Sequence, residues 1–327
     1  METDHEQTGI TLTGIDGANP LGFLAAIGCS VIANGVYPDL KIAWTNQAGV
    51  WRPQLLGCDF DREKFLENFY KAFVDSPADP YRIDARLPFE AKRFSTALLD
   101  WGKRSHVDDR RTIDLLGGFG TELYPDDKGV FQDTQFRMVR SADADGQGLP
   151  AYALKSRLAT DKEKMRVALF GPWSYQDVFF KQHDEKTGKM NKRPVPSFRW
   201  DPMDDRRYAL RWGNPTKKSE NDLGTVVAAN ALAVEALGML PVFTVGRSSR
   251  TTGFHRASNR KHYFTWPVWS CPVGLDTVRS LLALKELAPD GGNTAKLRAM
   301  GVVEVYRCQR IAQNQYYNNF TSAESVA

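Results

Sequence analysis

The residues with the clearest chemistry are basic and aromatic side chains between Glu235 and Asp276, an interval that contains no aspartate or glutamate. Fixed positive charges displace counterions from a phosphate backbone and so bind nucleic acid without reading its sequence. Aromatic faces stack on unpaired bases, each stacked base contributing roughly 1–3 kcal/mol. The cations and histidines of the interval are Arg247, Arg250, His255, Arg256, Arg260, Lys261 and His262, and its rings are Phe243, Phe254, Tyr263, Phe264, Trp266 and Trp269.

Hydroxyl side chains lie between these cations. Ser248, Ser249, Thr251 and Thr252 are expected to donate hydrogen bonds to phosphate oxygens, and arginine can also fork onto a guanine edge. The interval predicts a strand, a basic hairpin and a returning strand. The alternative is a solvated hairpin whose rings belong to the core, and some of the rings must do so.

A second basic patch covers residues 181–193. Its cations are Lys181, Lys186, Lys189, Lys192 and Arg193, against the acids Asp184 and Glu185. We include Lys189, Lys192 and Arg193 among the candidate nucleic-acid-binding residues. Taken alone, the patch is more typical of a charged, turn-rich loop.

Three aspartates offer the best case for metal chemistry. Asp201, Asp204 and Asp205 follow one another in WDPMDDRR, and with His255 they would form a metal-dependent nuclease or nucleotide-processing site if they converged. Their spacing lacks the ligand ladder of a calcium loop, and Asp before Pro is a common turn opening. We therefore expect no metal here.

A second acidic group has a plainer interpretation. His106 precedes Asp108 and Asp109, and these acids are followed directly by Arg110 and Arg111. One histidine and two carboxylates do not complete a metal site, and the neighbouring arginines neutralise the acids. A self-compensating charged turn is expected.

Enzyme signatures are otherwise missing from the sequence. It has no phosphate-binding G-x-x-x-x-G-K-[ST], no H-E-x-x-H and no G-x-S-x-G. Gly117, Gly118 and Gly120 follow a predicted helix, whereas glycines that cradle phosphate lie between a strand and a helix N-terminus. We expect no catalytic residue and no cofactor.

The elements that position these residues begin with a buried helix. Asn19 is a typical N-cap and Pro20 suits the first helical position, where a missing N–H costs nothing. Apolar residues follow at helical spacing up to Ile32. The small residues Ala25, Ala26 and Gly28 would let another backbone approach closely.

The remaining pattern mixes helices and strands without a strict β-α-β spacing. Strands are expected at 40–44, 50–56, 241–245, 262–269 and 302–308, and two strand-like runs flank the acidic turn in 198–212. Helices are expected at 60–74, 92–103, after Asp161, after Asp222 and at 275–287. The fold class predicted is α+β, with mixed or antiparallel sheets packed with several buried helices.

A polar, glycine-rich stretch at 139–150 is the predicted boundary between two halves. Residues 1–140 would form an N-terminal α+β half, and residues 141–327 a C-terminal α+β half with the basic aromatic hairpin. One continuous domain is the alternative, because 327 residues suit either arrangement.

Composition points to an ordinary globular protein. Hydrophobic residues make up 42% and charged residues 25%, and the net charge of +4 permits a local nucleic-acid surface without requiring one. The four cysteines lie far apart in sequence, which suits a reducing cytosol. The N-terminus lacks a signal-peptide core, and no apolar run reaches the ~18 residues of a membrane span. We expect a cytoplasmic protein with no membrane partner.

Three stretches together resemble one known family. They are TGIDGANPLGFLAAIG, SFRWDPMDDRRYALRW, and AANALAVEALGML followed by RTTGFHR and FTWPVW. They are similar to the small, large-subunit-like CRISPR-associated proteins of type I-U systems, also called type I-G, and the resemblance spans most of the chain. It implies no catalytic residue.

The resemblance implies a place in an antiviral surveillance complex. The partners would be a guide RNA, target DNA, other effector subunits and a separate helicase–nuclease that the subunit helps to recruit. In such complexes base pairing with the guide reads the target, while protein reads shape and a short flanking motif. The expected function is thus a non-catalytic subunit. The alternatives are the metal-dependent enzyme above and a scaffold whose two small-residue helices dock partner proteins.

Overall fold

The computed structural model describes most of the chain. The described residues are 9–82, 90–104, 110–126, 129–138, 149–183, 188–204, 224–258, 260–289, 293–312 and 318–326. Several predictions concern residues outside these ranges. They are the His106 to Asp109 turn, Asp205, the run after it, Asp222 and most of the predicted boundary loop.

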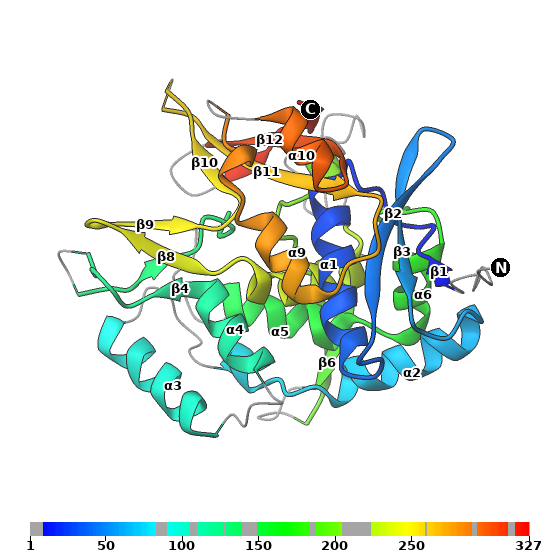
Figure 1. Cartoon of the computed structure of the whole chain (residues 1–327). Coiled ribbons are helices and arrows are strands. Elements are labelled where there is room, and N and C mark those ends of the chain that lie inside the picture. Colours follow the sequence, from blue (N-terminus) through cyan, green and yellow to red (C-terminus); the bar gives the residue numbers. More distant parts are fainter. Residues whose placement is uncertain are drawn as a thin grey trace, which may run out of the picture.

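Helices and antiparallel sheets are both present, which confirms the predicted α+β class (Figure 1). The helices are α1 (Pro20–Asn34), α2 (Arg62–Asp75), α3 (Ala91–Arg104), α4 (Arg111–Phe119), α5 (Leu149–Ala159), α6 (Lys162–Phe170), α8 (Val227–Glu235), α9 (Leu275–Leu282) and α10 (Thr294–Ala299), with 3-10 turns η1 (Asp79–Arg82), η3 (Ala236–Met239) and η4 (Lys285–Leu287). The strands are β1 (Gly9–Thr11), β2 (Lys41–Gln47), β3 (Val50–Leu56), β4 (Gly120–Thr121), β5 (Gln132–Asp133), β6 (Phe179–His183), β7 (Met190–Pro194), β8 (Val242–Val245), β9 (Ser248–Thr251), β10 (Phe254–Arg256), β11 (His262–Trp269), β12 (Val302–Ala312), β13 (Asn318–Phe320) and β14 (Glu324–Ser325).

Helix α1 is capped as its sequence predicts. The Asn19 side chain accepts hydrogen bonds from the backbone N–H groups of Leu21 at 2.8 Å and Gly22 at 3.2 Å, and Pro20 opens the helix. Almost every residue of α1 is buried, because α8 packs along it. A Cβ at Gly28 would lie 1.7 Å from the Leu232 carbonyl oxygen, so only glycine allows this approach.

The packing of α1 on α8 weakens the scaffold alternative. The small residues that were to dock a partner protein are already covered by the other helix of this chain. Segments from both sides of the predicted boundary also share one hydrophobic core.

Helix α8 begins later than predicted. Its first residue is Val227, and its N-cap residue Val226 makes no side-chain hydrogen bond. The carboxylate of Asp177, 50 residues earlier, accepts a hydrogen bond from the Val227 N–H at 2.9 Å. A buried helix N-terminus needs acceptors for its first N–H groups, and here a distant residue supplies one.

The predicted strands in 198–212 are not formed in the described part of that segment. Residues 198–200 carry no strand, and residues 202–204 are helical. Trp200 is fully buried, and its indole N–H donates to the Phe136 carbonyl at 2.8 Å. The apolar alternation that suggested strands therefore reflects core packing.

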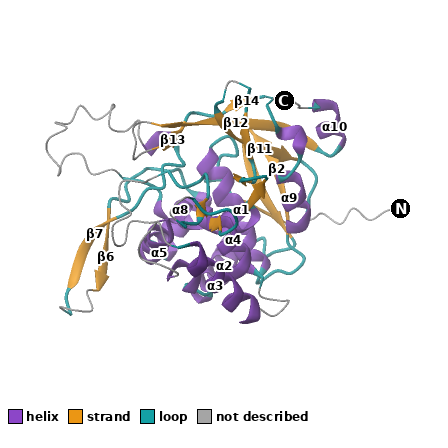
Figure 2. Cartoon of the chain, turned by 90° about the vertical axis from the view of Figure 1, so that its left-hand side faces the viewer, coloured by secondary structure: helices purple, strands orange, loops and turns teal. Residues whose placement is uncertain are grey.

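The sheets are small, and each described pairing between strands is antiparallel. One has the order β1-β3-β2, one has β10-β11-β12-β13 with β14 also on β12, and three hairpins pair β4 with β5, β6 with β7 and β8 with β9. Figure 2 shows the five-stranded sheet across the top of the molecule, with most helices below it.

The described helices include none with both the length and the apolar character that crossing a membrane requires. All four cysteines are free thiols. Burial raises the pKa of the Cys29 and Cys308 thiols well above the usual value, so both behave as apolar core residues.

Candidate nucleic-acid interface

The predicted basic stretch forms two consecutive hairpins rather than one. β8 pairs with β9, and β10 then pairs with β11, which continues into the five-stranded sheet through β12. Gly253 joins the hairpins with a φ of +81°, and a Cβ there would lie 2.9 Å from the Phe264 ring. A glycine is thus required where the chain turns onto the core.

Most of the rings that were predicted to stack on bases are sealed in the core. Phe254 is 6% exposed, Trp269 is 1% exposed, and Phe264 and Trp266 are fully enclosed. Trp266 donates its indole N–H to the Gly17 carbonyl at 2.9 Å, which fixes this ring against the N-terminal segment. The stacking part of the prediction is therefore wrong for these four rings, because other parts of the core pack against them.

The two threonines of the prediction are also enclosed. The Thr251 hydroxyl accepts a hydrogen bond from the Gln135 N–H at 2.9 Å, and the Thr252 hydroxyl donates to the Pro241 carbonyl at 3.0 Å. Both side chains are less than a tenth exposed. Their hydroxyls hold this corner of the fold together and do not face a ligand at the surface.

The cations, by contrast, lie at the surface. Arg247, Arg256, Arg260 and Lys261 are exposed, and Arg250 on β9 is partly exposed. None of the four arginines forms an ion pair with a carboxylate of the described chain. Arg250 lies directly across the β8–β9 hairpin from Phe243, one of the two rings that remain accessible.

Neighbouring strands gather further positive charge at the end of the sheet. Arg256 on β10, His262 on β11 and Arg310 on β12 are register partners, so their side chains leave the same face of the sheet. The His262 ring is fixed by Gln135, whose amide nitrogen lies 2.9 Å from Nδ1. Burial together with Arg310, Arg256 and Arg250 lowers the pKa of His262.

The opposite face carries a second cross-strand row. His255, Tyr263 and Gln309 are register partners on β10, β11 and β12. Burial, then Arg307 and Arg250, lowers the pKa of His255 to about 4, so this imidazole is neutral at pH 7. The Arg307 guanidinium lies 5.9 Å from the centre of the Tyr263 ring.

Sequence reasoning missed Arg307, Gln309 and Arg310. They lie more than 40 residues after their register partners on β11, outside the acid-free interval. The alternating polar residues of β12 predict a strand with one exposed face. The neighbouring sequence does not show which strand pairs with it.

The second basic patch is a hairpin rather than a loop. Lys189, Lys192 and Arg193 are exposed on or next to β7, and the Lys192 ammonium lies 3.9 Å from the centre of the Phe179 ring. The β8–β9 hairpin projects to the left in Figure 1, whereas β6–β7 projects sideways in the perpendicular view of Figure 2. The two patches therefore leave the body in different directions.

The metal-site alternative gains no support from the described residues. The Asp201 carboxylate accepts a hydrogen bond from the Tyr175 hydroxyl at 2.7 Å, and Asp204 accepts from Ser197 at 2.6 Å and from Thr225 at 3.2 Å. Both aspartates are buried. Within the described ranges, no group of three His, Cys, Asp or Glu side chains could hold a metal ion.

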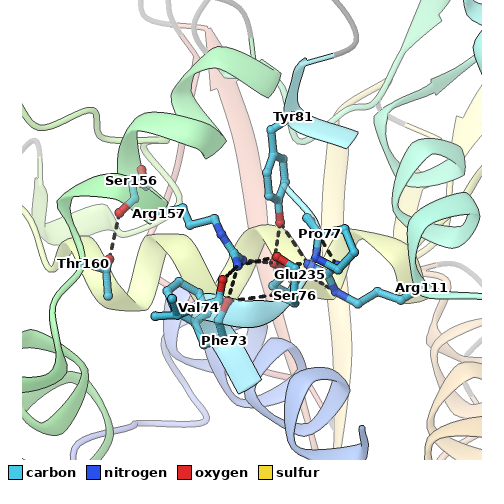
Figure 3. A network of polar contacts seen from close by, with 10 residues as sticks. All are labelled: Phe73, Val74, Ser76, Pro77, Tyr81, Arg111, Ser156, Arg157, Thr160 and Glu235. Atoms are coloured by element: carbon cyan, nitrogen blue, oxygen red, sulfur yellow. Dashed lines mark hydrogen bonds and ion pairs between the residues drawn. The ribbon is translucent and has the colours of Figure 1, made fainter. Parts of the chain in front are cut away.

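A buried polar network surrounds the end of α8 (Figure 3). Glu235, at the end of α8, accepts hydrogen bonds from Arg111 at 2.6 and 2.9 Å and from the Tyr81 hydroxyl, and Arg157 lies 3.6 Å away. Arg157 also donates to the carbonyls of Phe73, Val74 and Ser76 at the end of α2. The network ties α2, η1, α4, α5 and α8 together.

A cavity of about 1270 Å³ lies beside this network, and its lining includes no residue of β8, β9, β10 or β11. Five of its charged lining residues are paired with one another. Arg111 binds Glu235, while Arg110 at 3.2 Å and Arg279 at 2.7 Å both bind Asp114.

Comparison with known proteins supplies no relative. No protein-family model matches the chain, and a search of the curated proteins finds no significant match. Function therefore has to be inferred from the charge and geometry of the described side chains, together with the resemblance of the three sequence stretches.

Proposed function

We propose that this protein binds nucleic acid without catalysing a reaction, using the basic side chains of the hairpins β8–β9 and β10–β11. The observation that carries the proposal is the group of arginines on β9, β10 and the adjoining turns. Arg247, Arg250, Arg256 and Arg260 reach the surface and have no carboxylate partner in the part of the chain that the structure describes. Unneutralised arginines on ordered strands form a ready electrostatic contact for a phosphate backbone.

The enclosed rings change how the binding would work. Four of the six predicted stacking rings belong to the core, so charge rather than stacking supplies most of the affinity. A surface of this kind tracks a backbone with little dependence on base sequence. Its affinity should fall steeply with salt.

The resemblance supports a more specific assignment within this proposal. The protein would be a subunit of a type I CRISPR effector complex, contacting guide RNA or target DNA, contributing to flanking-motif recognition and helping to recruit a helicase–nuclease. Such a role needs binding surfaces and no catalytic set. Purification of the chain from its native cells should then bring down other subunits and a discrete small RNA, and recovery of neither would contradict the assignment.

The binding proposal is tested by removing charge at two places. Fluorescence anisotropy would measure the affinity of labelled single- and double-stranded oligonucleotides over a range of salt concentrations. Arg250→Ala combined with Arg256→Ala should weaken binding broadly and lower the slope of log K against log salt by about 1.4 for a single strand, because each phosphate contact contributes about 0.7.

The control removes the same charge elsewhere. Lys71→Ala combined with Lys162→Ala acts on exposed residues of α2 and α6, which lie on the other side of the molecule from β10 (Figure 1). This variant should keep the affinity and slope of the unmodified protein. An unchanged slope in the arginine variant, or equal losses in both variants, would contradict the proposal.

A further inference from the structure

The outer face of the C-terminal sheet carries hydrogen-bonding groups that the fold does not use. The Tyr263 hydroxyl and the Gln309 side-chain amide form no hydrogen bond to any described residue. Both side chains are partly exposed and lie next to each other across β11 and β12. An amide offers one acceptor and two donors, so this pair presents a ring face beside a complete hydrogen-bonding edge.

A hollow of about 670 Å³ opens over this pair. Its polar lining includes Lys261, Tyr263, Gln309, Asn319, Thr321 and Ser322. The volume falls within the range of small-molecule sites and is large enough for one nucleotide. The rim is already organised, because the Gln309 N–H donates to the Thr321 hydroxyl at 3.0 Å and the Arg199 guanidinium donates to Asn319 at 3.2 Å.

The side chains around the hollow favour a ligand that carries a negatively charged phosphate and an uncharged, flat ring. Lys261 lies at the hollow, and Arg307 lies against the Tyr263 ring, so positive charge is close to any phosphate that enters. His255 is the neighbour of Tyr263 on the other side and carries no charge at pH 7. One carboxylate, Glu324, also lines the hollow, against these cations.

We propose that this hollow binds one unpaired nucleobase of a single-stranded nucleic acid, with Tyr263 stacking on the base and Gln309 hydrogen-bonding its edge. The site deepens the proposed function and rests on it: the arginines hold the backbone, and the hollow takes a base from the bound strand. A base inside a duplex is covered on both faces by its neighbours, so only an unstacked base can lie on a tyrosine ring.

The test separates contacts to bases from contacts to the backbone. Anisotropy titrations would compare a labelled ten-nucleotide single strand with an abasic strand that carries the same phosphates and no bases. The unmodified protein should bind the base-bearing strand at least 5-fold more tightly. Tyr263→Ala should weaken that binding by roughly 5- to 150-fold, the range measured for one stacked base, and leave the abasic affinity unchanged.

Two further variants guard against a folding defect. Tyr263→Phe keeps the ring and should keep most of the preference for the base-bearing strand over the abasic strand. Gln309→Ala changes a partly exposed side chain and should reduce that preference by a few-fold. Thermal unfolding would confirm that each variant is folded. Parallel DNA and RNA strands would show which nucleic acid supplies the base.

The possible failures are distinct. Equal affinity for base-bearing and abasic strands, or equal losses on both with Tyr263→Ala, would overturn the base site and leave backbone binding intact. Absence of binding to every strand at low salt would overturn the proposed function and the base site with it.

Discussion

Two regions of this molecule use arginine in opposite ways. Around Glu235, Arg111 and Arg157 are largely enclosed and paired with a buried carboxylate. On the hairpins β8–β9 and β10–β11, Arg250 and Arg256 reach solvent with no carboxylate partner within the described ranges. A buried, paired arginine stabilises the fold, whereas a surface arginine without a partner retains its charge for a ligand. Whether a carboxylate of the protein neutralises the arginines, rather than how many arginines there are, distinguishes a structural site from a binding site.

The strongest test of this contrast removes a carboxylate from each region. Glu235→Ala leaves Arg111 and Arg157 as uncompensated, largely enclosed charges, and we expect it to lower the free energy of unfolding by about 3 kcal/mol or more. Glu324→Ala removes an exposed carboxylate beside the basic sheet and should change stability by less than about 0.5 kcal/mol. Urea denaturation followed by circular dichroism measures both. Similar decreases in the free energy of unfolding for the two variants would contradict the contrast between the two regions.

The next test removes an arginine from each region. Arg111→Ala should cost about 2–3 kcal/mol of stability, less than Glu235→Ala, because Arg157 remains near the carboxylate. Arg256→Ala should cost less than about 0.5 kcal/mol and instead weaken oligonucleotide binding. Urea denaturation measures the stability of both variants, and fluorescence anisotropy measures their affinity for oligonucleotides. A folded Arg111→Ala protein that lost binding as fully as Arg256→Ala would break the comparison.

The burial of His255, together with its neighbours Arg307 and Arg250, also predicts an acid-dependent loss of stability. His255 has an unfolded pKa near 6.5 and a folded pKa of about 4, so the unfolded chain binds a proton first as the pH falls. This contribution is fully present above pH 6.5 and is lost between pH 6.5 and about 4. It amounts to at most about 3 kcal/mol, and less in practice because the ring is partly exposed.

His255→Gln isolates this contribution from other titrating groups. The free energy of unfolding of the variant should fall less between pH 6.5 and 4 than that of the unmodified protein. Denaturation curves at half-unit pH steps provide the comparison. If the free energy of unfolding of the two proteins fell equally with pH, His255 would not be held neutral in the folded protein.

The smallest predicted effect is a change in the His255 pKa when the nearby Arg250 charge is removed. Arg250 is one of the charges that lower the pKa of His255, after burial and Arg307. Arg250→Ala should therefore raise the His255 pKa by less than about one unit, as followed by NMR titration of the ring protons. Lys71→Ala on α2 should leave it unchanged, and an identical shift in both variants would point to net charge rather than proximity.

Local sequence determined much of the framework. The Asn19 cap, the Pro20 start and the small face of α1 are encoded by adjacent residues, and the structure contains each of them. The acid-free interval was equally visible, because it is a property of composition. These features were predictable since the groups that interact lie within a few residues of one another.

Tertiary structure alone decided which of these residues are available at the surface. The alternation of β11 made rings plausible on either face, and only packing against the N-terminal segment placed Phe264 and Trp266 inside. The rows through His262 and Tyr263 depend on pairing with β12, and the Glu235 network draws on partners up to 154 residues away. Burial and strand register depend on contacts between distant segments, so residue types give the chemistry and the fold determines which groups can carry it out.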